Sequence, residues 1–446
     1  MKLKNKHVLV MGLGLHGGGA GVTKYLIQKG AKVRVTDLKD KKDLEPSLKK
    51  LAGLPVDYVL GQHRQVDFEN ADLIIKNPGV ADSSPYLTLA RKKALPVLMD
   101  INLFWQDCPS QKIIGITGTK GKTTTAHLVE KIIKQAGFKT VLAGNLGVSF
   151  LEVLPKISPD TWVILELSSW QLEGLAQEPS CPHISLITNI FPDHLNRYRD
   201  MASYVAAKKI IFTNQKKTDY LILNQDNPWS QKLANQAPGK TIFFSENDIS
   251  QKWQTKIKLI GKHNLGNIAA AIRVGQTLKI NRADLQKAIF SFSGLPHRLE
   301  FVNSIDKIDF YNDSAATNPD AAQAAITSFK KPLIWILGGT DKKLQFDELV
   351  KTASKQRQIK GFVFLEGDAT RKIQSKIKKA LPQAICQGPF TNFTQAITIA
   401  KKIAQKGDIV LLSPGAASFG MFKNEFDRGN QFKKIVNELA KNHQKN

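Results

Sequence analysis

Short apolar runs, each ended by glycine or polar residues, recur along the chain and alternate with segments of helical period. The strands predicted from these runs cover residues 7–11, 32–36, 71–75, 112–116, 141–143, 162–167, 184–190, 220–223, 241–244, 310–312, 333–337, 362–365 and 409–412. Helical spacing predicts helices at 20–29, 124–135, 201–213, within 259–278, and at 320–329 and 426–441. This alternation predicts an α/β protein with open parallel sheets, whose ligands bind at the carboxyl ends of strands.

Two breaks divide the pattern into three blocks. Residues 101–111, with Cys108-Pro109-Ser110, are predicted to be a linker, and Gly294-Leu295-Pro296 precedes the last block. A chain of 446 residues is long enough for two to three domains. We therefore expect domains at 1–107, 108–296 and 297–446.

The first block contains a glycine fingerprint. The run Gly12-Leu13-Gly14-Leu15-His16-Gly17 fits the G-x-G-x-x-G pattern, and Asp37 ends the next strand 20 residues after Gly17. Such glycines bring backbone close to a diphosphate, and the acid can accept a ribose hydroxyl. NAD and a UDP-sugar both offer these groups, so the motif does not choose between them. Asn77-Pro78-Gly79-Val80 follows another strand, as a ligand loop or as a plain turn.

The central block opens with a phosphate-binding pattern. An apolar strand leads into Thr117-Gly118-Thr119-Lys120-Gly121-Lys122-Thr123-Thr124, and a helix follows. Glycine amides and a helix N-terminus attract anions, the Lys122 side chain can reach phosphates, and the Thr123 hydroxyl can bind Mg²⁺. The strict P-loop requires glycine at position 116, where this chain has Ile116. We still expect a nucleoside-triphosphate site, because a plain glycine turn does not explain the run Gly-Lys-Thr-Thr-Thr.

Three polar residues at strand ends or on an apolar helix face are candidates for metal or catalytic roles. Glu166 ends a buried strand, where a carboxylate is costly unless it is paired or binds metal; the alternative is a helix-capping acid. His194 follows another strand, although a lone histidine is more often structural. Lys208 shares a helical stripe with Tyr204 and Ile211, so we expect it to be buried and to have a lowered pKa, rather than to be surface charge.

Further polar residues suit nucleotide contacts. Asn264 and Asn267 are three residues apart near the start of an Ala-rich helix, where they can bind a base or phosphate, or serve as polar caps. In the last block, glycines or polar residues follow each of four strands, in 313–319, 338–342, 366–368 and 413–415. That arrangement is typical of a doubly wound sheet with its site at one edge.

Composition excludes several classes of protein. Hydrophobic residues make up 42% and charged residues 23%, as in a globular protein, and no apolar run reaches the ~20 residues of a membrane span. We expect no signal peptide, because the first residues lack a long apolar segment. The three cysteines match neither a metal site nor a disulfide framework, which favours a reducing cytoplasm. The net charge of +26 can indicate nucleic acid, but the lysines are dispersed, so we expect anionic small substrates.

Taken in order, these motifs resemble the Mur ligase family over essentially the whole chain. The matching motifs are Gly118–Thr124, Glu166–Glu173, Thr188-Asn189, Asp193–Tyr198, Ala207-Lys208, Gly261–Asn264, His297–Glu300, Asn312–Ser314, Gly338-Gly339 and Leu412–Pro414. The resemblance implies three domains: a Rossmann-like N-terminal domain that binds UDP, a central P-loop-like ATP-binding domain, and a Rossmann-like C-terminal domain that binds the amino acid.

The resemblance also implies the reaction and its cofactors. Such an enzyme would be a cytoplasmic, monomeric, ADP-forming ligase of peptidoglycan precursor synthesis, with ATP and two Mg²⁺ ions as cofactors and Lys208 carbamylated. The Asp193–Tyr198 and His297–Glu300 motifs favour the branch that adds D-glutamate to UDP-N-acetylmuramoyl-L-alanine through an acyl phosphate. We expect neither nucleic-acid binding nor membrane insertion.

Residue roles follow from the same resemblance. The residues implied in ATP binding are Gly118, Thr119, Lys120, Gly121, Lys122, Thr123, Thr124, Asn264, Asn267, Arg298 and Asp313. The implied metal ligands are Thr123, Glu166, His194 and Lys208, and the implied catalytic residues are Lys122, His194, Lys208 and Arg298. The implied substrate contacts are Gly14, Leu15, His16, Asp37, Lys39, Asn77, Pro78, Gly79, Asn145, Thr317, Lys342 and Ser418.

One departure leaves the amino acid open. Ala315 stands where the family usually has lysine, and Asn424-Glu425-Phe426 departs from a phenylalanine pattern of some members. Lys343, next to Lys342, could supply the missing cation. A related ligase that uses L-glutamate or another amino acid, or a folylpolyglutamate-type enzyme, is therefore an alternative. Hydride transfer from NADH without ATP would instead indicate an oxidoreductase, and polynucleotide-stimulated ATP hydrolysis a nucleic-acid-binding NTPase.

Overall fold

A computed structural model describes residues 1–15, 17–145, 147–195, 197–342 and 344–443. The predicted roles of His16 and Lys343, and Asn196 of the Asp193–Tyr198 motif, lie outside these residues. The chain forms two compact units. The first comprises Met1–Thr255 with Leu265–Phe290, and the second comprises Lys256–Asn264 with the chain from Ser291 onward.

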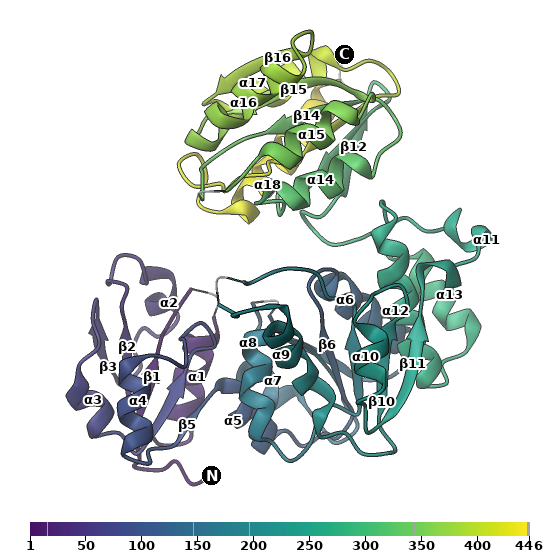
Figure 1. Cartoon of the computed structure of the whole chain (residues 1–446). Helices are drawn as coiled ribbons and strands as arrows, with labels where there is room; N and C mark the ends of the chain where they lie inside the picture. Colours follow the sequence, from purple (N-terminus) through teal and green to yellow (C-terminus); the bar gives the residue numbers. More distant parts are fainter. Residues whose placement is uncertain (16, 146, 196, 343, 444–446) are drawn as a thin grey trace. The chain divides into compact units, whose positions relative to one another are not determined.

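The first sheet of unit 1 is Rossmann-like (Figure 1). Its strands, all parallel in the order β3-β2-β1-β4-β5, are β1 (His7–Met11), β2 (Lys32–Asp37), β3 (Val56–Leu60), β4 (Leu73–Lys76) and β5 (Val97–Leu98). Its helices are α1 (Gly18–Gln28), α2 (Glu45–Lys49), α3 (Gln65–Glu69) and α4 (Pro85–Lys92). Alternate residues of β1 face opposite clusters, Val8 and Val10 on one side and Leu9 and Met11 on the other, so both faces are covered.

The second sheet of unit 1 carries the phosphate-binding motif. Its strands, parallel in the order β11-β10-β9-β6-β8-β7, are β6 (Ile113–Thr117), β7 (Thr140–Gly144), β8 (Trp162–Glu166), β9 (Ile184–Ile187), β10 (Tyr220–Asn224) and β11 (Lys240–Phe244). Its helices are α6 (Lys122–Gln135), α7 (Phe150–Val153), α8 (Ser169–Gly174), α9 (Met201–Thr213), α10 (Ser230–Ala234), α11 (Gln251–Gln254), α12 (His263–Thr277) and α13 (Arg282–Phe290), with short 3₁₀ turns at 154–156, 175–177 and 246–248. Strand β6 lies between β9 and β8, so the loop after it opens at the middle of the sheet.

The predicted linker is wrong, because a buried helix occupies most of it. Helix α5 (Asp100–Asp107) places Ile101 and Phe104 in the hydrophobic core of unit 1, both fully buried. Their spacing of three residues is helical. The Asn102 amide donates to the Gly174 carbonyl (2.7 Å), which fixes α5 against α8 of the central region. Cys108-Pro109 ends the helix and does not begin a flexible segment.

Unit 2 contains a mixed sheet (Figure 1). Its strands, in the order β12-β13-β17-β14-β15-β16, are β12 (Glu300–Ile305), β13 (Ile308–Asn312), β14 (Leu333–Leu337), β15 (Ile359–Leu365), β16 (Ile385–Phe390) and β17 (Ile409–Leu412). Its helices are α14 (Pro319–Thr327), α15 (Asp347–Lys355), α16 (Asp368–Ala380), α17 (Phe393–Ile403) and α18 (Glu425–His443). Strand β12 pairs antiparallel with β13, an edge that was not expected, because its exposed Phe301 and polar residues give no apolar run.

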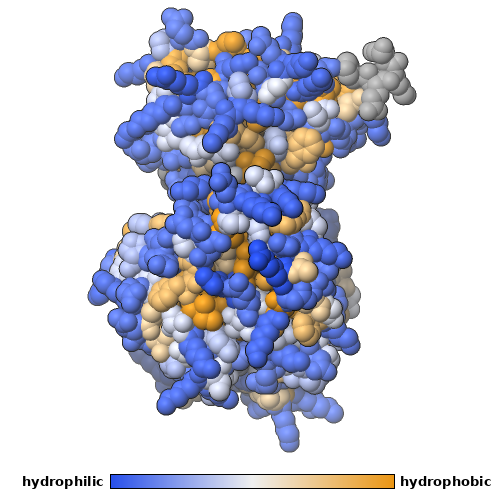
Figure 2. Space-filling view, turned by 90° about the vertical axis from the view of Figure 1, so that its right-hand side faces the viewer, coloured by the Kyte–Doolittle hydropathy of each residue, from blue (hydrophilic) through white to orange (hydrophobic). Residues whose placement is uncertain are grey.

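No helix among the described residues is both long and apolar enough to cross a bilayer. On the face that Figure 2 shows, hydrophilic side chains are spread widely and hydrophobic ones are interspersed among them.

Candidate active site

Two loops of the first sheet meet at the carboxyl ends of neighbouring strands β1 and β4. The Asn77 side chain joins them: its amide nitrogen donates to the Gly12 carbonyl (3.3 Å), and its oxygen accepts from the Gly79 amide (3.0 Å). Leu15 and Gly79 are exposed beside this junction. The structure therefore brings the glycine fingerprint and the Asn77–Gly79 turn together, as expected for one ligand site.

The carboxylate of Asp37 orders the glycine-fingerprint loop through hydrogen bonds to its backbone. One carboxylate oxygen accepts from the amides of Leu13 (2.8 Å) and Gly14 (3.1 Å), and the other accepts from the Lys39 amide (2.9 Å). A carboxylate has about four acceptor positions, so these bonds leave little of it for a ligand. The Lys39 side chain is exposed.

The first and second sheets meet within unit 1. Helix α1 packs against α7, and the Tyr25 hydroxyl on α1 donates to Asp107 of α5 (2.8 Å). The loop after β7 bends back onto β8, where the Asn145 side chain donates to Glu166 Oε1 (3.0 Å) and its backbone donates to the Glu166 carbonyl (2.9 Å). Asn145 is exposed, so it can contact a ligand and Glu166 at once.

The phosphate-binding loop requires glycine at two places. Gly118 has φ +146°, and a Cβ there would lie 1.9 Å from the Thr188 hydroxyl. Gly121 has φ +85°, and a Cβ there would lie 2.2 Å from Asn267 Oδ1. Any side chain would therefore displace a neighbour and strain the backbone. This explains why the glycines stand at 118 and 121 although the strict P-loop spacing fails.

Residues after β9 hold the loop in place from the other side. Asn189 Oδ1 accepts from the Lys120 amide (2.9 Å), and the Thr188 hydroxyl donates to the Lys120 carbonyl (2.7 Å). The Thr119 hydroxyl accepts from the Phe191 amide (3.0 Å). The Lys122 ammonium folds back to the carbonyls of Gly118 and Thr119, both at 3.0 Å. Thr123 and Thr124 occupy the first turn of α6, which begins directly after Gly121.

Glu166 has the character of a cation ligand. Its side chain is 1% exposed, and Oε2 makes no hydrogen bond in the structure. An orphaned carboxylate oxygen at a buried strand end is costly unless a cation lies there. Among the described residues, no group of three His, Cys, Asp or Glu side chains is arranged to hold a metal ion. Mg²⁺ commonly takes one or two carboxylates and completes its shell with phosphate and water, so Glu166 and a threonine hydroxyl fit it.

Lys208 is buried, as its helical stripe predicts. The side chain is 1% exposed, and Nζ donates to the Gly118 carbonyl (3.0 Å) and lies 4.6 Å from the centre of the Tyr204 ring. Burial, and secondarily the nearby charge of Lys122, lowers the pKa of Lys208 to about 7. The position and protonation of this amine therefore differ from those of a surface lysine.

His194 lies near Lys208 in a strained conformation. Its backbone φ is +54°, and its ring centre lies 5.2 Å from that of Trp170 and 6.1 Å from that of Tyr204. Burial lowers the pKa of His194, the charges of Lys208 and Lys122 lower it further, and Asp193 opposes them. The neutral imidazole is the form that binds metal.

Arg197 is a residue to which the sequence assigned no role. Its guanidinium donates to the Pro78 carbonyl (3.0 Å) and to Glu173 (2.8 Å), and it lies over the Trp170 ring. It thereby joins the Asn77–Gly79 turn of the first sheet to the loop that carries His194. The Asp193–Tyr198 motif contains it, but no spacing rule predicts a partner 119 residues away.

The candidate residues of unit 2 lie on loops at one edge of its sheet. Arg298 is exposed in a turn whose neighbours His297 and Leu299 have φ of +63° and +46°. Asp313, after β13, accepts from the Leu299 amide (3.1 Å) and the Ser413 hydroxyl (2.8 Å). Burial raises the pKa of Asp313 to about 7.

Three predicted amino-acid contacts share this edge. The Ser418 side chain is 3% exposed, and its hydroxyl makes no hydrogen bond in the structure. Lys342 is exposed, with Nζ 5.7 Å from the centre of the Phe419 ring. Thr317 lies two residues after Ala315, and its backbone amide donates to the Ala315 carbonyl (3.0 Å). An unpartnered buried hydroxyl such as that of Ser418 is suited to receive a ligand.

Asn264 and Asn267 differ in their surroundings. The Asn264 side chain is 8% exposed and donates to the Ile260 carbonyl (2.7 Å), which is a capping contact within unit 2. Asn267 lies in unit 1, where its Oδ1 accepts from the Thr125 hydroxyl (3.4 Å) and contacts Gly121. Asn267 is therefore part of the wall of the phosphate-binding loop.

Comparisons with known proteins cover the whole chain. Residues 6–99 match the model described as Mur ligase MurD-like, N-terminal domain; residues 116–275 match the Mur ligase middle domain; and residues 297–415 match the Mur ligase, glutamate ligase domain. A UDP-N-acetylmuramoylalanine–D-glutamate ligase of Roseiflexus sp. (strain RS-1) is 42% identical, covering 99% of this chain and 100% of its own. The enzyme of the same name from Borreliella burgdorferi (strain ZS7) is 36% identical, covering 98% and 99%.

Solved structures share the fold. The UDP-N-acetylmuramate-alanine ligase MurC of Thermotoga maritima has a TM-score of 0.62 at 17% identity, covering 98% of this chain and 100% of its own. A MurF ligase of the same organism, solved in complex with ADP, has a TM-score of 0.57 at 14% identity, covering 98% and 97%.

Proposed function

The chain belongs to the Mur ligase family, and on this premise we propose that it joins D-glutamate to UDP-N-acetylmuramoyl-L-alanine, converting ATP to ADP and phosphate. The observation that carries the proposal is the full-length identity of 42% to a relative that bears the name of this activity. The reaction belongs to the synthesis of peptidoglycan precursors. The same name recurs in relatives from distinct organisms at 32–36% identity, each over at least 97% of its length.

The chemistry is activation of a carboxylate followed by acyl transfer. An oxygen of the L-alanyl carboxylate attacks the γ-phosphorus of ATP, and the bond to the ADP oxygen breaks. The amine of D-glutamate then attacks the carbonyl carbon of the acyl phosphate. The tetrahedral intermediate loses phosphate, and the nitrogen loses a proton, which leaves the amide. The anionic reactants repel one another, so the protein must chiefly neutralise charge and position groups.

The loop from Gly118 to Thr124 is proposed to hold the triphosphate. The N-terminus of α6, which begins after Gly121, offers donors to the phosphates, whereas the amides of Thr119 and Lys120 donate to Asn189 and keep the loop in shape. Lys122 is proposed to exchange its bonds to loop carbonyls for the β- and γ-phosphates. Asn267 lies against Gly121, supports that loop and is proposed to contact the nucleotide.

Mg²⁺ would be held by residues that border the same loop. We assign Thr123 and the orphaned oxygen of Glu166 to one ion, and His194 and Lys208 to a second. The ions would supply positive charge to the transferring phosphoryl group. Residues of the chain orient these ligands: the Asn145 side chain donates to Glu166 Oε1, and an Asp193 carboxylate oxygen lies 3.8 Å from His194 Nε2.

Lys208 is proposed to act as a carbamate. The neutral amine attacks the carbon of CO₂ and loses a proton, which converts a buried cation into an anionic oxygen ligand. Its place 3.0 Å from the Gly118 carbonyl and its near-complete burial support this, because a buried ammonium without a carboxylate partner is costly. The lowered pKa of Lys208 makes the reactive amine available near neutral pH.

We propose that unit 2 supplies the remaining contacts to the nucleotide and the amino acid. Arg298 would meet a phosphate, and Asp313 and Asn264 the nucleoside. Thr317, Lys342 and the unpartnered hydroxyl of Ser418 would hold the carboxylates of the amino acid. We assign residues 1–107 to the UDP part of the substrate, through Gly14, Leu15, Asp37, Lys39 and Asn77 to Gly79. Residues 108–296 are assigned to ATP and residues 297–446 to the amino acid.

The proposed setting is the cytoplasm, where the enzyme acts as a monomer on small molecules. Cys108, Cys181 and Cys386 are free thiols, which suits a reducing compartment. The net charge of +26 is proposed to attract anionic substrates and not polynucleotide.

The test is phosphate release from ATP with UDP-N-acetylmuramoyl-L-alanine and a panel of amino acids in parallel, including D-glutamate, L-glutamate and basic D-amino acids. We expect release with D-glutamate and its dependence on all three substrates. Release with L-glutamate or a basic amino acid alone would replace D-glutamate with that amino acid as the substrate. No release with any amino acid would overturn the proposal.

A further inference from the structure

Helix α18 has, in its first turn, a buried arginine whose bonds run to two separate loops. Arg428 is fully buried, and its Nε donates to the Ser314 hydroxyl (2.9 Å). Its Nη2 donates to the Ser314 carbonyl (3.0 Å), and its Nη1 donates to the Ala416 carbonyl (3.3 Å). One guanidinium therefore bridges the loop that follows β13 and the loop that follows β17.

A gain in folding stability does not explain why an arginine is buried at this position. Among the described residues, no carboxylate lies within ion-pair distance of it, and its acceptors are carbonyls and a hydroxyl. A buried cation held in this way costs more than an apolar side chain of similar volume. Its planar fork of donors, however, fits several acceptors in one fixed arrangement. The arginine therefore fixes the positions of the two loops relative to each other.

The next residue fixes a third segment. The Gly429 carbonyl accepts from the Asn312 amide (3.3 Å), and that amide nitrogen also lies 2.9 Å from His297 Nδ1. A Cβ on Gly429 would lie 2.1 Å from His297 Nδ1, so only glycine lets the ring approach. His297 and Leu299, with left-handed backbones, flank Arg298. The turn that presents Arg298 is thus packed directly against α18.

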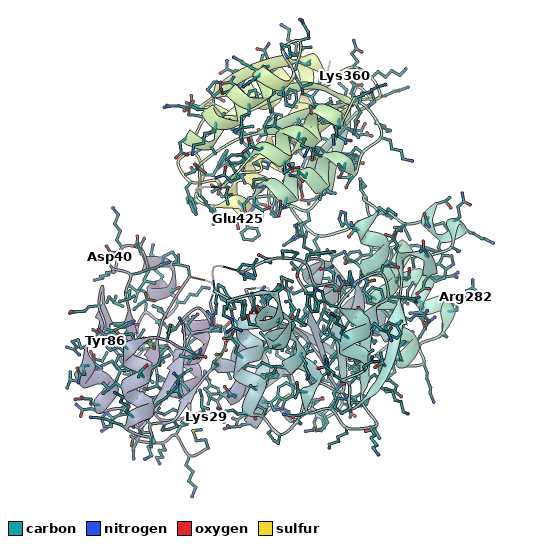
Figure 3. The ribbon with its side chains drawn as sticks, viewed as in Figure 1. Lys29, Asp40, Tyr86, Arg282, Lys360 and Glu425 are labelled. Carbon is teal, nitrogen blue, oxygen red and sulfur yellow. The ribbon has the colours of Figure 1, made fainter. Side chains whose placement is uncertain are left out.

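Each segment carries residues with a proposed role. Asp313 and Thr317 lie on the loop after β13, Ser418 lies on the loop after β17, and Arg298 lies on the turn before β12. Glu425, labelled in Figure 3, marks the start of α18, and its carbonyl accepts from the Ser314 hydroxyl (2.7 Å). The first turn of α18 is therefore the common support of the groups assigned to nucleotide and to amino acid.

We propose that Arg428 and Gly429 are positioning residues of the ligase. They hold these three segments in fixed positions relative to one another, so that nucleotide and amino acid are bound together. The proposal rests on the function proposed above. It implies that loss of this support weakens ATP and amino-acid binding jointly. Binding of the UDP substrate, assigned to unit 1, is unaffected.

The test compares four variants of the full chain in steady-state kinetics. Arg428→Met keeps the volume and removes the fork, Arg428→Lys keeps the charge, Gly429→Ala displaces His297, and Asn430→Ala is the control at an exposed position of the same helix. For Arg428→Met we expect KM for ATP and for D-glutamate each to rise about tenfold, and KM for the UDP substrate to change less than about twofold. Arg428→Lys should lie between Arg428→Met and wild type.

Gly429→Ala separates positioning from stability. The added Cβ would lie 2.1 Å from His297 Nδ1, so a purely structural role predicts a less stable protein whose KM values stay normal while it is folded. We expect KM for ATP to rise about tenfold in Gly429→Ala, because the turn that bears Arg298 is displaced, and no change in Asn430→Ala. A fall in kcat with all three KM values unchanged in both Arg428→Met and Gly429→Ala would overturn the proposal.

Hydrogen exchange distinguishes failure of this inference from failure of the proposed function. If the wild-type protein has no ligase activity, the proposed function is refuted. The positioning role of Arg428 is then tested by amide exchange of residues 313–318 and 414–418. We expect both loops to exchange faster in Arg428→Met, with strands β14 and β15 unchanged. Exchange equal to wild type in both loops would overturn the inference whatever the activity.

Discussion

The side-chain nitrogen of Lys208 lies 3.0 Å from the carbonyl oxygen of Gly118, across 90 residues of chain. Helix α9 therefore contacts the phosphate-binding loop through this buried amine, and also through the Tyr204 hydroxyl, which lies 3.2 Å from that of Thr119. The same loop contacts β9 through Thr188 and Asn189. The loop is held from two sides before any nucleotide arrives, so it needs little reorganisation on binding.

Replacing Lys208 should abolish most of the activity. For Lys208→Ala we expect kcat to fall about a hundredfold or more, because a ligand of the proposed metal site is lost. A short carboxylic acid should restore part of the rate, since it can occupy the space of the carbamate. The control is Lys209→Ala, which removes the neighbouring lysine outside the site and should keep the rate. Full activity in Lys208→Ala would contradict the role.

Gly118 and Gly137 both have positive φ but differ in the space around them, so substituting each allows a direct comparison. A Cβ at Gly118 would overlap the Thr188 hydroxyl, whereas a Cβ at Gly137 (φ +84°) would meet nothing within 4 Å. Gly137→Ala should cost about 1 kcal/mol of unfolding free energy, from backbone strain. Gly118→Ala should cost more and should also weaken ADP binding. Calorimetric titration with ADP and denaturant unfolding check both; equal effects of the two substitutions would contradict the steric argument.

Arg197 should matter for the UDP substrate. Because its guanidinium holds the Pro78 carbonyl, Arg197→Ala should raise KM for UDP-N-acetylmuramoyl-L-alanine about tenfold, and KM for ATP much less. Arg199→Ala is the control, since the Arg199 side chain is 89% exposed and, within the described part of the chain, bonds only to adjacent Asp200. The prediction fails if both variants have the same KM for the UDP substrate.

ATP binding should depend on pH through Asp313. Burial raises the pKa of this carboxyl to about 7, and ribose hydroxyls bind best to its ionised form. KM for ATP should therefore rise as pH falls below about 7, by up to about tenfold per pH unit. Asp313→Asn should bind ATP more weakly at pH 8 and lose this part of the pH dependence. The difference between the two pH profiles isolates Asp313 from the titration of ATP itself.

Asp100 should lower stability at neutral pH. Burial raises its pKa from 3.8 to about 6, so the folded protein holds this proton more tightly than the unfolded chain. The stability contributed by the protonated form is lost as pH rises through that window, which corresponds to about 3 kcal/mol. Asp100→Asn should therefore raise the free energy of unfolding at pH 7.5 and have a smaller effect at pH 5. Asp160→Asn, at an 88% exposed side chain, is the control and should have no effect.

Patterns along the chain predicted most of the strands correctly. β1, β14 and β17 have the predicted bounds, and α9 runs from Met201 to Thr213 as its period indicates. These elements are buried runs or amphipathic helices, whose periodicity is read locally. The strands that were missed, β3, β5, β12 and β16, are half-exposed or edge strands, and their sequences carry little apolar contrast.

Helical spacing found one buried charge and overlooked another. Lys208 was predicted to be buried because it shares a stripe with Tyr204 and Ile211. Arg428 shares a stripe with Phe432 and Val436, four and eight residues on, and all three are fully buried. The same reasoning applied to α18 would have identified it. The buried helix α5, by contrast, was predicted to be a linker because Cys108-Pro109 outweighed the spacing of Ile101 and Phe104.

The sequence by itself determined the class of the fold, the phosphate-binding loop, the family and the residue types available for catalysis, because these depend on local period and on short motifs. Tertiary structure decided which of those residues have partners: the free oxygen of Glu166, the bond of Lys208 to Gly118, and the reach of Arg197 to Pro78. Such contacts join residues up to 119 positions apart, and no local pattern encodes them. Burial, which raises or lowers each pKa and leaves an oxygen without a partner, exists only once the chain has packed.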